Sequence, residues 1–524
     1  MSSTANLRSR RSAAQLHALA GVEREIRVQD SHNRRKYLRE FNEAFQSYES
    51  VLDSGQLQSA LNPADIVLVG DYHALRAAQR QAAALIEQRA LVGDRPVILG
   101  VETIFSRDQH ILDEWWRREI EEDELRQRIR FDLDWGYDWA PFYELLVAAR
   151  DHGEALYGLD CMPRENLRKI GARDRHAAIK IAEIREKHRD AVIFVLFGES
   201  HLAPGHLPRT LQKQMPEAKV VSVLQNIDAL YWRAAGERAD KVEAVRVNED
   251  VICLFNATPL EKYESYRLFL DQWSRCGDAP DFAPTLYNLI DSLASFLEIN
   301  RYSPHNTTQP KFLIDMLPEV YGGPSDAMLS RLLTRRGISV RERESVLSRI
   351  ECRGSAYIPQ VNAFYVREFQ MVHAAEDVAR FLHQACQGLP HRVKGQAAGE
   401  VETEEGNSPD RFYVSVIEHA VAYFGSRILY PARATPEAVN LSQLSRAACD
   451  KAAWAAADSA ADKFESLARE WGYRIGQEIY SAYLSGKVPP SGIRRLFLVH
   501  LNEPGVARKV CATVIAKLRS MARN

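Results

Sequence analysis

The sequence predicts an α/β fold, with a mostly parallel sheet wrapped by helices and followed by a large, mainly α-helical C-terminal region. Two observations predict the sheet. Short apolar runs alternate with helix-length segments between about residues 64 and 224, which is typical of parallel strands joined by helices. The runs 66–69 and 192–197 are wholly apolar, as expected for strands buried on both faces.

The elements can be placed in order along the chain. Helices are expected over about 34–60, 74–90, 107–130, 141–152 and 174–188, and strands over 66–69, 97–102, 155–159, 192–197 and 219–224. Residues 229–256 favour extended strands, including 230–232 and 251–255. The chain turns helical after about residue 259, with a long amphipathic helix over 454–484.

At 524 residues the chain is too long for one ordinary core, so more than one domain is expected. We expect a flexible basic N-terminus over 1–33, an α/β domain over 34–256 and a helical domain over 257–524. The polar, acidic stretch 390–409 predicts a disordered loop inside the helical domain.

Composition limits the possible partners and locations. The formal net charge of −2 implies neither a nucleic-acid partner nor an anionic membrane surface. No run of about 18 apolar residues is present, so no membrane span is expected. The seven cysteines are scattered without a C-x-x-C pair, and the N-terminus lacks an apolar signal region. These features predict a cytoplasmic protein.

Two related motifs follow the two most apolar runs. Gly70-Asp71-Tyr72-His73 comes after 66–69, and Gly198-Glu199-Ser200-His201 comes after 192–197. Glu102 closes a third predicted strand. Because right-handed crossovers place the carboxyl ends of parallel strands at one edge, we expect these side chains to meet there. Ligands of open α/β sheets bind at this edge.

Such a group of residues is suited to metal or haem chemistry. Zinc, manganese or iron could be ligated by His73, His201 and Glu102. The carboxylates of Glu102, Glu199 and Asp71 could orient these ligands or act as bases for a metal-bound water. Alternatively, a histidine or Tyr72 could ligate haem iron, with Trp135, Trp139 and Tyr143 beside the porphyrin. The residues alone leave both possibilities open.

The stretch from about 64 to 224 resembles the ChaN-like haem-binding domain of the Tiki/TraB/erythromycin-esterase superfamily. The matching motifs are Gly70–His73, Gly100–Glu102, Arg107–Gln109, Trp135–Tyr143, Ala172–Arg175 and Gly198–His201. The resemblance implies haem binding, or, by analogy with Tiki and TraB relatives, a metal-dependent hydrolase. By this resemblance, His73, Glu102 and His201 correspond to positions that the members of the superfamily share. Asp71 departs from the pattern, which more often has glutamate.

We therefore expect a ChaN-like protein that binds haem or a metal-centred ligand at the carboxyl ends of the strands. One alternative is a metal-dependent hydrolase of ester, amide or peptide bonds, and whether the chain is an enzyme stays open. Another is a non-enzymatic assembly module defined by the helical region, which could also mediate a homo-oligomer or a protein partner. The expected ligand is haem or another small molecule.

Overall fold

The protein is described by a computed structural model that covers residues 3–30, 36–162, 170–237, 242–275, 279–299, 317–323, 325–387, 408–435, 444–501 and 503–523. The chain forms two compact units: Glu25–Leu270, here called the α/β unit, and Met1–Arg24 with Asp271–Asn524, here called the helical unit. Helices α1 (Ser3–Gln29) and α12 (Pro259–Ser274) each cross this division. The α/β unit thus extends beyond residue 256, where the sequence placed its end.

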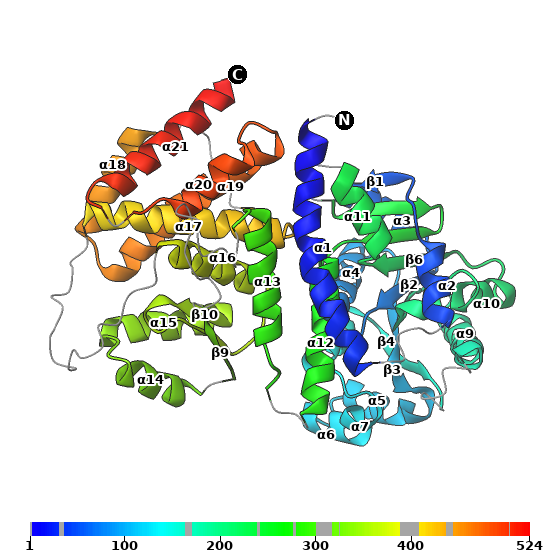
Figure 1. Cartoon of the computed structure of the whole chain (residues 1–524). Helices are drawn as coiled ribbons and strands as arrows, with labels where there is room; N and C mark the ends of the chain where they lie inside the picture. Colours follow the sequence, from blue (N-terminus) through cyan, green and yellow to red (C-terminus); the bar gives the residue numbers. More distant parts are fainter. Residues whose placement is uncertain are drawn as a thin grey trace. The chain divides into compact units, whose positions relative to one another are not determined.

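Within the described residues, the α/β unit contains an eight-stranded sheet of order β1-β7-β8-β6-β2-β5-β3-β4. Strands β1, β2, β3, β4 and β6 are labelled in Figure 1. The strands are β1 (Ser50–Leu52), β2 (Ile66–Asp71), β3 (Val97–Phe105), β4 (Ala155–Asp160), β5 (Val192–Gly198), β6 (Val220–Gln225), β7 (Ala244–Asn248) and β8 (Val251–Leu254). The six strands from β8 to β4 are parallel, and β7 and β1 add an antiparallel edge. The predicted fold class is confirmed.

Helices cover both faces of this sheet, because its central strands are apolar on both sides. One core contains residues of α4 (Arg76–Val92), α5 (Gln109–Trp116), α6 (Glu122–Arg128), α7 (Phe131–Asp134) and α8 (Trp139–His152). The other contains residues of α2 (Lys36–Ala44), α9 (Ile170–Lys187), α10 (Leu207–Gln214) and α11 (Asp228–Glu237). Helix α3 (Ser54–Leu61) follows β1.

The neighbouring strands β2, β5, β3 and β4 place the candidate residues at adjacent positions. Asp71, the last residue of β2, lies in register with Gly198, the last residue of β5. On the other side of β5, Val101 of β3 pairs with Leu196, so Glu102 lies at the same level of the sheet. Asp160 ends β4, the next strand. The predicted convergence of strand ends therefore follows from the strand order.

The helical unit is built around α17 (Pro409–Leu429), which is buried along most of its length. Its other helices are α13 (Ala283–Phe296), α14 (Asp326–Arg335), α15 (Val340–Arg353), α16 (Met371–Gln387), α18 (Arg446–Ala457), α19 (Ala461–Leu484), α20 (Pro490–Leu498) and α21 (Val506–Arg523). A small sheet of order β10-β11-β9 contains β9 (Glu319–Gly322), β10 (Ser355–Ile358) and β11 (Ala363–Val366). No helix among the described residues is long and apolar enough to cross a membrane.

Some segments differ from the sequence expectation. Residues 3–29 form a helix with buried Ala18, Val22 and Ile26, where a flexible segment was expected. Residues 230–232 lie in α11 and not in a strand, because Leu230 and Ala234, four positions apart, pack on the sheet. The loop predicted over 390–409 lies outside the described residues, except for its last two positions.

Candidate functional site

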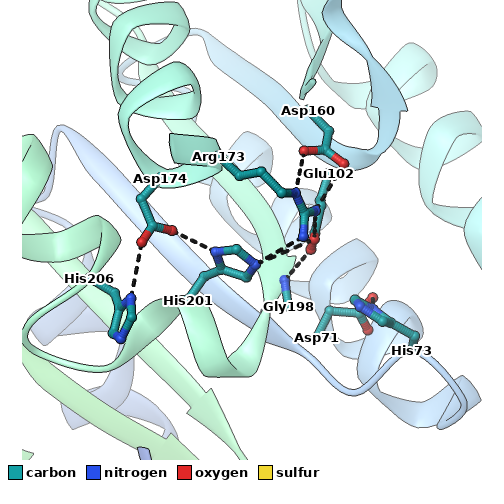
Figure 2. A network of polar contacts seen from close by, with 9 residues as sticks. All are labelled: Asp71, His73, Glu102, Asp160, Arg173, Asp174, Gly198, His201 and His206. Atoms are coloured by element: carbon teal, nitrogen blue, oxygen red, sulfur yellow. Dashed lines mark hydrogen bonds and ion pairs between the residues drawn. The ribbon is translucent and has the colours of Figure 1, made fainter. Parts of the chain in front are cut away.

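The first motif forms a histidine–carboxylate pair at the end of β2 (Figure 2). Nδ1 of His73 lies 2.7 Å from a carboxylate oxygen of Asp71, and the other oxygen accepts a hydrogen bond from the Gln79 amide of α4. Burial disfavours the imidazolium, but the charge of Asp71 outweighs it and raises the pKa of His73. The His73 side chain is 24% exposed, and its Nε2 forms no hydrogen bond with any described residue.

Glu102 lies beside His73, on the neighbouring part of the sheet edge. Its carboxylate accepts a hydrogen bond from the backbone N–H of Gly198 and is 3.7 Å from Nε2 of His201. A Cβ atom at Gly198 would be 3.0 Å from Glu102 Oε2 and 3.2 Å from His73 Cε1. A side chain at residue 198 would therefore require Glu102 or His73 to shift by a few tenths of an ångström.

The guanidinium group of Arg173, from α9, neutralises the carboxylates of this edge (Figure 2). It forms two hydrogen bonds with Asp160, of 2.8 and 2.9 Å, and another with Glu102. Burial alone would raise the pKa of Glu102, but Arg173 and the two imidazoles lower it to about 2. Glu102 is thus a buried, permanently ionised partner of Arg173 near neutral pH.

His201 is more restricted than His73. Its Nδ1 contacts Asp174, and its Nε2 is 3.4 Å from Nη1 of Arg173. Because a guanidinium can only donate, Nε2 must accept, which assigns the proton to Nδ1. Asp174 also holds His206 through Nδ1 at 3.0 Å. Only 4% of the His201 side chain is exposed, so both ring nitrogens are used inside the protein.

Glu199 turns away from this network toward α12. Both of its oxygens accept hydrogen bonds from Nζ of Lys262, at 2.9 and 3.1 Å. Burial raises the pKa of Glu199 despite this lysine. Lys262 also lies 4.7 Å from the ring centre of Tyr72, whose pKa burial and nearby acids raise well above the ordinary value. A tyrosinate ligand at Tyr72 is therefore disfavoured.

Of the aromatic residues expected beside a porphyrin, Trp135 lies next to His73, whereas Tyr143 packs elsewhere. The ring of Trp135 lies 4.4 Å from that of His73, and Tyr137 lies 5.3 Å from it. Tyr137 stacks on Phe269 of α12. Tyr143, in contrast, packs against Trp139 and Trp115 on α8 and α5. The interpretation of Tyr143 as a cofactor contact is thus not supported by its position, because the helical turn directs its ring into the core between those helices.

Sequence reasoning assigned no role in the site to Arg173, Asp174, Lys262 or Tyr137. General rules could have indicated two of these residues. Buried acids at strand ends need a cation, which Arg173 supplies, and a buried histidine needs an acid that orients it, which Asp174 supplies. Lys262 had none, because it lies some 60 residues after Glu199 on a separate helix.

The residues fit a resident metal ion poorly. Among the described residues, no group of three or more histidine, cysteine, aspartate or glutamate side chains is arranged to hold a metal ion. The predicted ligands Glu102 and His201 both face Arg173 instead. A cation at that position would be repelled by the guanidinium, whereas Nε2 of His73 remains suited to an iron atom carried by a larger ligand.

One family model matches the chain. Residues 57–188 match the family described as haem-binding uptake, Tiki superfamily, ChaN. The resemblance expected from the motifs is confirmed for this segment, which is about a quarter of the chain. The ChaN-like segment includes His73, Glu102 and Arg173, while His201 and Lys262 lie beyond it. No curated protein and no solved structure matches the chain.

Proposed function

We propose that the α/β unit binds haem at the carboxyl ends of its strands, where Nε2 of His73 would hold the iron. The observation that carries this proposal is the Asp71–His73 pair, in which Asp71 accepts from Nδ1 and leaves Nε2 directed away from it. A carboxylate behind a ligating imidazole fixes its tautomer and increases its basicity. Bound haem would supply an iron centre for ligand binding or electron transfer.

The other residues have supporting roles in this proposal. Trp135 and Tyr137 flank His73 and provide flat apolar surface for a porphyrin. His201 supports Glu102 and Arg173 and is not an iron ligand, because both of its ring nitrogens already have partners. The ChaN-like segment, which contains His73 and both rings, belongs to a family described by haem binding.

A titration with haemin tests the proposal. We expect the wild-type chain to give a Soret band typical of histidine-ligated haem, and His73→Ala to lose that band. His110→Ala removes an exposed histidine of α5 and serves as the matched control. A Soret spectrum unchanged in His73→Ala would contradict the assignment of His73 as the residue that holds the iron.

A second candidate is hydrolysis of an ester or amide bond by a water molecule that His73 activates. The Asp71–His73 pair favours it, because a carboxylate-supported imidazole is a general base and needs no metal. Arg173 and Glu102 would then be the charged side chains nearest to the bond that is hydrolysed. Hydrolysis of a panel of esters that survives a chelator and is lost in His73→Ala would support this candidate over haem binding.

Location and assembly remain proposals. The six described cysteines are free thiols, which supports a reducing compartment such as the cytoplasm. Self-association through the helical unit is tested by light scattering of the purified chain, where a monomer at all concentrations would contradict it.

A further inference from the structure

Two cysteines face each other in the helical unit. Cys449 of α18 and Cys511 of α21 are both buried, and their Sγ atoms lie 3.8 Å apart although 62 residues separate them in the chain. A disulfide bond is about 2.05 Å long, so the two sulfurs need to approach each other by only roughly 1.8 Å to form one. The fold therefore brings together a pair of thiols that a small movement of either side chain could join.

The surrounding contacts hold the two helices at this level. Asp450, which follows Cys449, accepts hydrogen bonds at 3.0 and 3.3 Å from Arg508, which lies three positions before Cys511. The hydroxyl of Tyr413 on α17 donates to the same carboxylate. The ion pair and this hydrogen bond therefore keep the two thiols opposite each other.

The packing around Cys511 leaves room for its sulfur to move. Cys511 lines an apolar cavity of about 250 Å³, whose other walls include residues of α17, α19 and α20. Protein interiors are normally close-packed, so an empty space beside a side chain lets that side chain rotate without displacing its neighbours. The cavity also provides space for a small oxidant beside the sulfur.

The same pair resists oxidation by ordinary disulfides. The hydrogen bond with Cys449, together with burial, raises the pKa of Cys511 well above the ordinary value, so this thiol keeps its proton near neutral pH. A protonated thiol exchanges slowly with other disulfides, because the thiolate is the reactive form. In a reducing compartment the pair therefore stays as two thiols until a stronger and smaller oxidant reaches it.

We propose that Cys449 and Cys511 form a disulfide bond when the protein meets a peroxide, and that this bond locks α21 to α18. One sulfur attacks a peroxide oxygen, which gives a sulfenic acid and a water molecule. The other thiol attacks the sulfenic sulfur, forms the S–S bond and releases a second water molecule. Two thiols thus lose two electrons and two protons, and one hydrogen peroxide is reduced to two water molecules. This site lies wholly in the helical unit and does not depend on haem binding by the α/β unit.

Peptide mapping of the full-length chain without a reductant tests the proposal. The protein is exposed to hydrogen peroxide in native buffer, its remaining thiols are blocked with an alkylating reagent, and it is then digested. We expect one cross-linked pair of peptides that contains Cys449 and Cys511 and that dithiothreitol separates. Cys449→Ala should lose this pair, whereas Cys352→Ala, which removes an exposed cysteine of α15, should keep it.

Hydrogen exchange of α21 shows whether the bond acts as a lock. Oxidation should slow the exchange of α21 amides at least about tenfold in wild type, because a cross-link restricts local opening of the helix. In Cys449→Ala the exchange should be the same before and after peroxide. The proposal would be overturned by no Cys449–Cys511 pair at a peroxide concentration that oxidises Cys352, by cross-links spread over several cysteines, or by unchanged exchange of α21.

Discussion

Replacement of Arg173 by methionine tests most directly how much the guanidinium group stabilises the carboxylates at the strand ends of the α/β unit. Arg173 is the cation that both Glu102 and Asp160 contact, and all three side chains are at least nine-tenths buried. Methionine has a similar length, so the variant mainly removes the charge and the hydrogen bonds. Two carboxylates would then remain buried next to each other without the guanidinium that both contact.

The expected loss follows from the pKa of Glu102. Its depression from 4.5 to about 2 corresponds to about 3 kcal/mol of stability, which is present above pH 4.5 and is lost as the pH falls toward 2. Arg173→Met should therefore lower the free energy of unfolding by at least about 3 kcal/mol at pH 7. The difference from wild type should shrink at pH 4, because Glu102 is then protonated in the variant.

Hydrogen exchange of peptides from β3 and β5 measures this loss within the α/β unit, even if the helical unit unfolds separately. Arg175→Met, on an exposed position of the same helix, is the matched control and should exchange like wild type. A loss below about 1 kcal/mol, or a loss of the same size at pH 7 and pH 4, would refute the reasoning.

Three further predictions concern the residues around the network. Asp71→Asn should lower the pKa of His73, because the carboxylate that favours the imidazolium is removed. In an acid titration the haemin Soret band should then be lost at a lower pH than in wild type, and haemin should bind about tenfold more weakly. An unchanged midpoint pH would contradict the Asp71–His73 pairing. Lys262→Met should lower the free energy of unfolding in urea by about 3–5 kcal/mol, because it leaves the Glu199 carboxylate buried without its cation. The double variant with Glu199→Gln should regain part of this loss. Additive effects of the two substitutions would show that the two side chains are not coupled. Gly198→Ala should lower the free energy of unfolding by about 1–3 kcal/mol and weaken haemin binding, because the added methyl group would crowd Glu102 and His73. Wild-type stability together with wild-type haemin affinity would contradict this prediction.

The strand ends could be predicted because apolar runs and glycine exits are local signals. Ile66–Asp71 and Val192–Gly198 are strands, and their motifs meet at one edge as expected. The convergence of His73, Glu102 and His201 was also predictable, since right-handed crossovers align the carboxyl ends of parallel strands.

The partners of these residues were not predictable to the same degree. Glu199 was expected among the residues of the site, but its carboxylate pairs with Lys262, which no local pattern connects to it. Glu102 and His201 were expected to ligate a metal, yet Arg173 occupies the position between Asp160, Glu102 and His201. A pairing between distant side chains depends on how helices pack on the sheet, and that packing has no short-range signature.

The sequence by itself determined the α/β architecture and the edge of the sheet at which His73, Glu102 and His201 meet. Only the tertiary structure decided that His73 has a ring nitrogen available to a ligand while His201 is held between Asp174 and Arg173. The physical reason is that strand periodicity is encoded over a few neighbouring residues, whereas the charge state and accessibility of an imidazole depend on groups brought to it from other helices.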